Sequence, residues 1–186
     1  MKELLFAKRH TWFFLFAVAL IFTTCKKRDF FSEIPFIEYK THYFLTDAFG
    51  RDSLVVLIFS FKDGDGDLGL NQGDTFPPYN PVVDFEGRSL NPYYYNLYVD
   101  YLEWQNGIFN YVTRPFSNDT LKYEFRFPSL TPEGRHLAIR GDIEVKISPS
   151  PFPNAKDTVM YKIFVYDRKL HKSNVAETPP VIWINE

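Results

Sequence analysis

The sequence predicts an all-β protein, built as an antiparallel two-sheet sandwich of the immunoglobulin or fibronectin type. Three observations predict it: apolar and polar residues alternate in several segments, Gly and Pro recur between these segments, and no segment sustains the i, i+3, i+4, i+7 spacing of an amphipathic helix. Seven or eight strands are expected. The Cys and Trp hallmarks of true immunoglobulin domains are absent, and a closed barrel is the alternative.

The expected strands follow one another through residues 36–186. Charged residues separate apolar ones in Leu121–Phe127 and in Ile143–Ile147, which indicates strands with one solvated face. Three segments are apolar on both faces and are expected to be central strands: Leu54–Phe61, Tyr93–Trp104 and Val159–Tyr166. The complete expected set is Phe36–Leu45, Asp52–Phe61, Tyr93–Gln105, Ile108–Arg114, Thr120–Phe127, His136–Ser148, Asp157–Tyr166 and Val181–Ile184.

The strongest turn signal is the pair Asn106-Gly107, which separates two of the expected strands. Both residue types tolerate the positive φ that a type I′ turn requires at its two central positions. The sequence therefore predicts a tight hairpin there.

The first 24 residues have the organisation of a lipoprotein signal peptide. Lys8 and Arg9 precede an apolar run from Trp12 to Phe22, and the run is followed by Cys25, the only cysteine of the chain. The run is too short to span a bilayer comfortably. Cys25 would become the new N-terminus, carrying a diacylglycerol and an N-linked acyl chain such as palmitate, and would anchor the protein without a transmembrane helix.

Phe22, Thr23 and Thr24 depart from the usual residues before a lipidated cysteine, so an uncleaved signal anchor is the alternative. With cleavage, the chain divides into a signal peptide of residues 1–24, the lipidated Cys25 with a tether through residue 35, and a β-sandwich domain of residues 36–186.

Composition excludes some function classes. Residues 1–24 contain three basic residues and one acidic residue, so the remaining 162 residues carry 18 basic and 22 acidic ones, a net charge of −4. Nucleic-acid binding needs clustered Lys and Arg, and the one cluster, Lys26-Lys27-Arg28, would face lipid headgroups beside the anchor. No disulfide is available to the domain, so stability must come from packing, to which the 19% aromatic content contributes.

An acidic glycine loop follows the strand that ends at Phe61. It reads Asp63-Gly-Asp-Gly-Asp67-Leu-Gly-Leu-Asn71, with Asp74 three residues later. Three carboxylates at alternate positions repel one another unless a hard cation lies among them, and Ca²⁺ takes six to eight oxygen ligands from such loops. The expected ligands are Asp63, Asp65, Asp67, the Gly69 carbonyl, Asn71 and Asp74.

The spacing is similar to that of EF-hand and dockerin-type loops, with Asp63 at position 1 and Leu70 at position 8, where an apolar side chain points to the core. Position 6, which favours Gly, is Leu68, and the loop follows a strand instead of a helix. The alternative is a solvated acidic turn. A bound Ca²⁺ would stiffen the loop, since every expected ligand is an oxygen and no catalytic base is apparent nearby.

Four segments together resemble small Bacteroidota lipoproteins of unknown function: Cys25-Lys26-Lys27, the DGDGDLG loop with its preceding Lys62, Leu130–Arg135, and the DRKLHKSN segment, Asp167–Asn174. The resemblance covers nearly the whole mature chain. It implies a lipid-anchored protein of the outer membrane, on either the periplasmic or the cell-surface side. Lys26, Lys27 and Asp29 partly fit the export signal of such surface lipoproteins.

The resemblance also implies modification sites. Asp-Ser/Thr-aliphatic triplets resemble the O-glycosylation signal of that phylum and occur at Ser53, Thr120 and Thr158, where an ordinary strand start is the alternative.

Asp167 and Asn174 bracket a loop like those that carry calcium ligands in cadherin-like sandwiches. A plain turn, in which these side chains bond to their own backbone, is the preferred interpretation.

No motif for an enzyme is present in the sequence: HExxH, GxSxG and the P-loop pattern are missing, and the histidines beyond the signal peptide, His42, His136 and His171, are far apart. A non-catalytic accessory protein that binds an envelope partner is therefore expected, through edge strands or through the Gly73–Pro92 loop. The alternative is a glycan-binding module in which Tyr93, Tyr94, Tyr95 or Trp104 stacks on sugar rings.

Overall fold

The computed structural model describes residues 31–82, 90–114, 118–131, 137–148 and 158–183, and these form nine strands without a helix. The predicted all-β class is confirmed. Among the same residues there is no helix long and apolar enough to cross a membrane. The predictions for residues 1–30, which include the signal peptide, Cys25 and most of the tether, lie outside the described residues, as does His136.

The smaller sheet has three antiparallel strands: β1 (Phe36–Thr46), β2 (Asp52–Asp63) and β6 (Ile139–Ile147). The central strand is β2, whose register places Leu57 opposite His42 of β1 and Val145 of β6. Alternate β2 residues from Val55 to Phe61 point into the domain and are buried, and Val56 on the opposite face is buried as well. Burial on both faces explains why this segment is apolar along its length.

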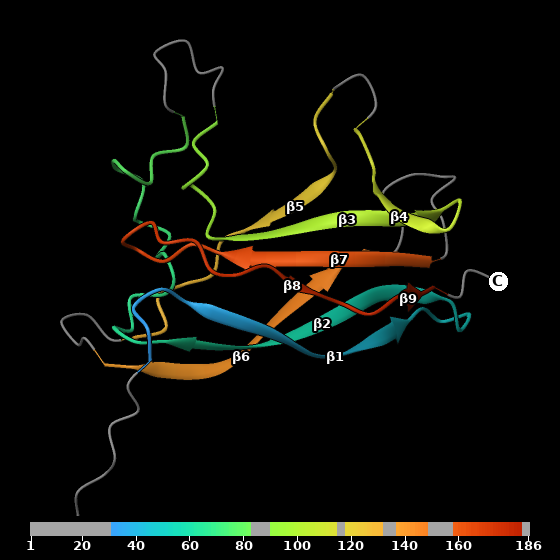
Figure 1. Ribbon diagram of the computed structural model, residues 1–186, viewed down its shortest axis with the longest axis horizontal. Coiled ribbons are helices and arrows are strands. Elements are labelled where there is room, and N and C mark those ends of the chain that lie inside the picture. The colour runs from blue at the N-terminus through green and yellow to red at the C-terminus, as the bar shows by residue number, and fades with distance from the viewer. Residues whose placement is uncertain (1–30, 83–89, 115–117, 132–136, 149–157, 184–186) are drawn as a thin grey trace, which may run out of the picture.

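The larger sheet is also antiparallel and contains β3 (Leu97–Gln105), β4 (Ile108–Tyr111), β5 (Lys122–Phe125), β7 (Thr158–Val165), β8 (Ala176–Glu177) and β9 (Val181–Ile182). One edge of β3 pairs with β5 near its start and with β4 near its end, while its other edge pairs with β7. β8 and β9 pair with successive parts of β7. Figure 1 shows the two sheets one above the other, consistent with a β-sandwich.

The core lies between the sheets. Tyr101 of β3 and Tyr161 of β7 are fully buried, with ring centroids 5.9 Å apart, and face buried residues of β2 such as Phe59. Each fully buried apolar side chain contributes about 1.5–3 kcal/mol. Packing of this kind holds the described domain without a disulfide, because none of its residues is a cysteine.

The Asn106-Gly107 hairpin is confirmed. Both residues have positive φ, 55° and 89°, and Gln105 pairs with Ile108 across the turn.

The predicted start of the third strand is wrong, because β3 begins at Leu97 and not at Tyr93. The side chain and the carbonyl of Asn91 accept hydrogen bonds from the Tyr93 and Tyr94 amides, at 3.0 and 3.1 Å, which holds this segment in a turn. The sequence also does not predict β8, whose two residues are too few to show a period.

Candidate metal centre

The acidic loop lies at one end of the sandwich, where it passes from β2 of the smaller sheet to the edge of the larger one (Figure 1). Backbone hydrogen bonds fasten it on three sides: the Gly64 amide donates to Ser32 at 2.8 Å, the Leu70 amide donates to Phe127 at 2.9 Å, and Asp67 accepts from the Arg168 amide at 3.3 Å. Leu68 and Leu70 are buried, as the sequence predicts for Leu70. The loop is therefore a packed part of the domain.

The glycines of the loop leave no room for a side chain. A Cβ on Gly66 would lie well inside van der Waals contact with the Leu137 carbonyl oxygen, and one on Gly69 would meet the backbone of Pro128 and Ser129. Both glycines also have positive φ, 72° and 108°. The glycines thus let neighbouring backbone approach one side of the loop while the aspartates project from it.

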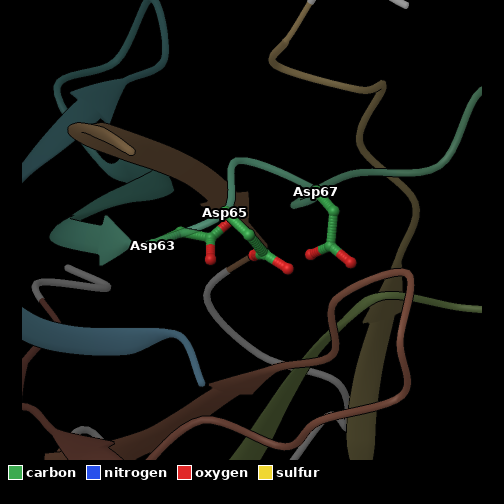
Figure 2. A group of neighbouring side chains, drawn as sticks. All are labelled: Asp63, Asp65 and Asp67. Carbon is green, nitrogen blue, oxygen red and sulfur yellow. The ribbon is translucent and has the colours of Figure 1, made fainter. Parts of the chain in front are cut away.

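Three carboxylates converge in this loop. Asp63, Asp65 and Asp67 each offer an oxygen, and these oxygens lie within 4.8 Å of one another. Figure 2 shows the three side chains projecting to the same side of the loop. Such an arrangement could hold a metal ion, and all of its protein ligands would be oxygens.

Asp63 is the most enclosed of the three. It has no exposed surface, and its Oδ2 accepts a hydrogen bond from the Leu68 amide at 3.1 Å. Its Oδ1 is buried and receives no hydrogen bond from the described residues, and the same is true of Oδ1 of Asp67. Both oxygens of Asp65 are also buried without a hydrogen bond from the described residues, although Oδ2 lies near an ammonium. Buried carboxylate oxygens are normally hydrogen-bonded, so the cluster could accommodate a cation.

The carboxylates also perturb one another's pKa. Burial, followed by the charge of Asp65, raises the pKa of Asp63 to about 7. Burial, with the charges of Asp167 and Asp65, raises the pKa of Asp67 to about 6. Burial acts in the same direction on Asp65, but the Lys169 ammonium, together with the neighbouring Asp63, outweighs it and lowers the pKa of that carboxyl. The cluster holds more negative charge than its surroundings compensate.

Two of the predicted ligands are engaged elsewhere. Asp74 pairs with Arg168, with Oδ2 of the carboxylate 2.6 Å from Nη1, and also accepts the Asn71 amide at 2.8 Å. The side-chain oxygen of Asn71 accepts from the Ser129 amide at 3.3 Å. The structure therefore brings together three of the predicted ligands and directs Asn71 and Asp74 away from them, while Gly69 packs against Pro128.

The second candidate loop, Asp167–Asn174, packs directly on the acidic loop, since Leu68 and Asp167 form a β-bridge. Asp167 is buried and accepts from the amide and the ring Nδ1 of His171, at 2.8 and 2.9 Å, as expected for a turn. Asn174 instead caps the edge of β1 by bonding to both backbone groups of Ile37, each at 2.8 Å.

Sequence reasoning misses one residue of this site, Lys169. Its ammonium lies 2.7 Å from Oδ2 of Asp65 and 3.1 Å from Oε2 of Glu33. No spacing signal could have identified it, because Lys169 follows Asp65 by more than a hundred residues and only the packing of two loops brings them together.

The three candidate glycosylation residues lie on or beside strands. Ser53 is half-buried in β2 and donates to the Leu45 carbonyl at 2.8 Å, Thr120 is exposed in a bridge with Thr113, and Thr158 is half-buried at the start of β7. Of these, Thr120 is the most accessible hydroxyl.

His42 shares a 2.7 Å hydrogen bond with the Tyr39 hydroxyl and is well separated along the chain from the acidic loop.

The candidate sugar-stacking aromatics do not form a flat platform. Tyr93, Tyr94 and Tyr95 are half-buried, and the rings of Tyr94 and Tyr95 meet at 76°. Trp104 is 44% exposed, but it packs edge-on against Phe109. A separate cavity of about 330 Å³ opens on the β5 side of the larger sheet; its lining includes Tyr95, Tyr98, Arg114, Asp119, Lys122 and Glu124.

The chain matches no protein-family model, no curated protein and no solved structure. The resemblance to Bacteroidota lipoproteins therefore stays a prediction.

Proposed function

We propose that this chain is a non-catalytic, lipid-anchored protein of the bacterial outer membrane, an interaction module whose acidic loop is stabilised by Ca²⁺. One observation carries the calcium part of the proposal: the carboxylates of Asp63, Asp65 and Asp67 converge, with buried oxygens that no described donor reaches. Ca²⁺ is the ion favoured by an all-oxygen ligand set on an irregular loop, whereas Zn²⁺ favours Cys and His.

The position of the loop gives the ion a structural role. The loop is fastened to Ser32, to Phe127 and to Arg168, which belong to three different parts of the chain. A cation that neutralises the cluster would hold these segments together at one end of the sandwich. Loop stiffening, without substrate chemistry, is the function that this arrangement supports.

The described part of the chain begins at the same end of the domain. Ser32 and Glu33, which precede β1, contact the acidic loop and Lys169. The β3–β4 hairpin lies at the opposite end (Figure 1). A chain tethered through Cys25 would therefore present this hairpin away from the membrane.

The tip of that hairpin is suited to a protein partner. Ile108 is 61% exposed, Tyr111 49% and Trp104 44%. Exposed apolar side chains gathered on one element are typical of interaction surfaces, and Trp and Tyr are enriched among residues that dominate binding energy. Phe76, 77% exposed in the Gly73–Pro92 loop, is a further apolar contact residue.

Adding Ca²⁺ to the chelator-treated protein is expected to raise its Tm. A ligand that binds only the folded state, at 100 times its Kd, adds about 2.7 kcal/mol, which corresponds to about 5–10 °C for a domain of this size. Thermal unfolding followed by circular dichroism measures this shift. Asp65→Asn should abolish it. Asp142→Asn is the matched control, because it also removes a carboxylate paired with a lysine, Lys40 at 2.6 Å, and should keep the shift.

The calcium shift should be larger at about pH 8 than at about pH 5. The pKa of Asp63 is raised from 3.8 to about 7 on folding, so the metal-free folded state binds more protons than the unfolded chain between these values. Stability of the metal-free protein therefore falls as the pH rises through this window. Ca²⁺ binds the deprotonated carboxylates and offsets that loss. An equal Tm shift at both pH values would contradict the proposed ligands.

A glycan is the second candidate ligand of the module, and the 330 Å³ cavity favours it. Two tyrosines and four charged side chains in its lining can stack on a sugar ring and bond to its hydroxyls. If glycans bind there, an array of bacterial and host glycans should give hits that Tyr95→Ala weakens about two- to tenfold, the usual size of a lost aromatic contact. Tyr43→Ala, on the exposed face of β1, is the control. An array without hits would leave the protein partner as the candidate.

A further inference from the structure

Lys169 places a positive charge at the mouth of the acidic cluster. Its Nζ lies 2.7 Å from Oδ2 of Asp65 and 3.1 Å from Oε2 of Glu33, and its side chain is 50% exposed. A tight turn holds it there: the Leu170 amide donates to the Asp167 carbonyl at 3.2 Å, and Leu170 has a φ of +68°. The β-bridge between Asp167 and Leu68 fixes this turn against the acidic loop.

The ammonium satisfies only part of the cluster. It reaches Asp65, whereas the buried Oδ1 atoms of Asp63 and Asp67 receive no hydrogen bond from the described residues. Asp63 has no exposed surface, so water reaches its unpartnered oxygen least. Asp63 is fully buried, and one of its two carboxylate oxygens has no described donor; this is a second observation, beside the acidic sequence pattern, that a cation belongs in this loop.

We propose that Lys169 is an internal counter-ion that competes with the divalent cation for Asp65 and so sets the affinity of the site. This inference rests on the proposed calcium site. A doubly charged ion among Asp63, Asp65 and Asp67 repels an ammonium a few ångströms away, and the ammonium already holds Oδ2 of Asp65, one of the oxygens available to the ion. Binding therefore exchanges Lys169 for the metal, and Lys169 keeps Glu33 as its partner on the exposed side.

The exchange predicts that removing Lys169 lowers the stability of the metal-free protein but raises its affinity for Ca²⁺. In the metal-free protein Lys169 offsets the repulsion among the carboxylates, so its removal should lower the Tm measured with chelator. In the presence of Ca²⁺ the lysine is a competitor, so its removal should strengthen binding. A lysine that only supported the fold would weaken both properties when removed.

Calorimetric titration of CaCl₂ into the purified, chelator-treated protein tests the inference. Lys169→Gln should bind Ca²⁺ about tenfold more tightly than wild type, because it removes one positive charge close to a divalent ion in a partly solvated site. Lys169→Arg keeps the charge and should stay close to wild type. Lys162→Gln is the matched control, since Lys162 also pairs with a carboxylate at 2.7 Å, that of Glu177, but on β7 and β8.

The outcomes separate this inference from the proposed function. Equal affinities of wild type and Lys169→Gln, with calcium bound by both, would overturn the role of Lys169 and leave the calcium site standing. Tighter binding in Lys162→Gln as well would reduce the effect to overall charge and would also overturn it. If neither wild type nor Lys169→Gln binds Ca²⁺ up to millimolar concentrations, the proposed function itself is wrong.

Discussion

Replacing Gly66 with alanine is expected to destabilise the protein by about 3 kcal/mol, because it combines a positive φ with overlap of the new Cβ and fixed backbone. The φ of Gly66 is 72°, and its Cβ would fall on the Leu137 carbonyl oxygen, directly before β6. Neither group can move without shifting the loop or the strand. Urea unfolding followed by fluorescence measures the loss.

Gly107→Ala is the control that isolates the backbone conformation. Gly107 also has a positive φ, 89°, but a Cβ there meets no atom within 4 Å. Only the cost of the left-handed conformation, about 1 kcal/mol, is expected. If both variants lost the same free energy, the close approach between Gly66 and Leu137 would not contribute to stability.

The two residue types of the loop therefore have separate roles. Gly66 and Gly69 are required by backbone packing whether or not a metal binds. The aspartates have no such packing reason, since burial of their charges opposes folding. A variant of a glycine should change stability with and without Ca²⁺, whereas a variant of Asp65 should change the response to Ca²⁺.

Cys25→Ser is expected to transfer the protein from the membrane fraction to the soluble fraction of cells that process lipoproteins. Each buried methylene of an acyl chain contributes about 0.8 kcal/mol of membrane affinity, so loss of several chains removes nearly all binding. Labelling with radioactive palmitate should mark the wild type and leave Cys25→Ser unlabelled. The result has a clear interpretation because the chain has no other cysteine.

Thr23→Ala is the control for the anchor, because it alters a residue before the cleavage site and keeps the cysteine. It should stay labelled and membrane-bound. Cys25→Ser protein that remained in the membrane fraction would contradict the lipid anchor and would favour an uncleaved signal anchor.

Much of the fold is predictable because the central strands bury one or both faces. The apolar run of β2 contains Leu57 and Phe59, and that of β7 contains Tyr161 and Ile163. The sequence pattern alone predicts that these side chains are buried, and they are. Prediction fails where local polar groups override the pattern. The apolar run from Tyr93 continues into β3, but the hydrogen bonds of Asn91 hold its first residues in a turn.

Only the part of the site whose residues lie close together in the sequence could be predicted. The three aspartates of the loop come together because only one glycine separates each from the next, and the structure places one oxygen of each within 4.8 Å of the others. Asn71 and Asp74 follow the spacing of a calcium loop, yet Ser129 and Arg168 engage them from distant parts of the chain. Lys169 likewise reaches the site only because the Asp167–Asn174 loop packs on the acidic loop.

Calorimetric titration of Ca²⁺ into chelator-treated wild type, Asp63→Asn and Asp74→Asn tests the central claim most directly. The three-carboxylate site predicts one ion bound per chain in wild type, no binding in Asp63→Asn, and binding retained in Asp74→Asn, whose carboxylate pairs with Arg168. Circular dichroism of each variant establishes that it is folded. A wild type that takes up no Ca²⁺, or a folded Asp63→Asn that binds it as tightly as wild type, would contradict the account.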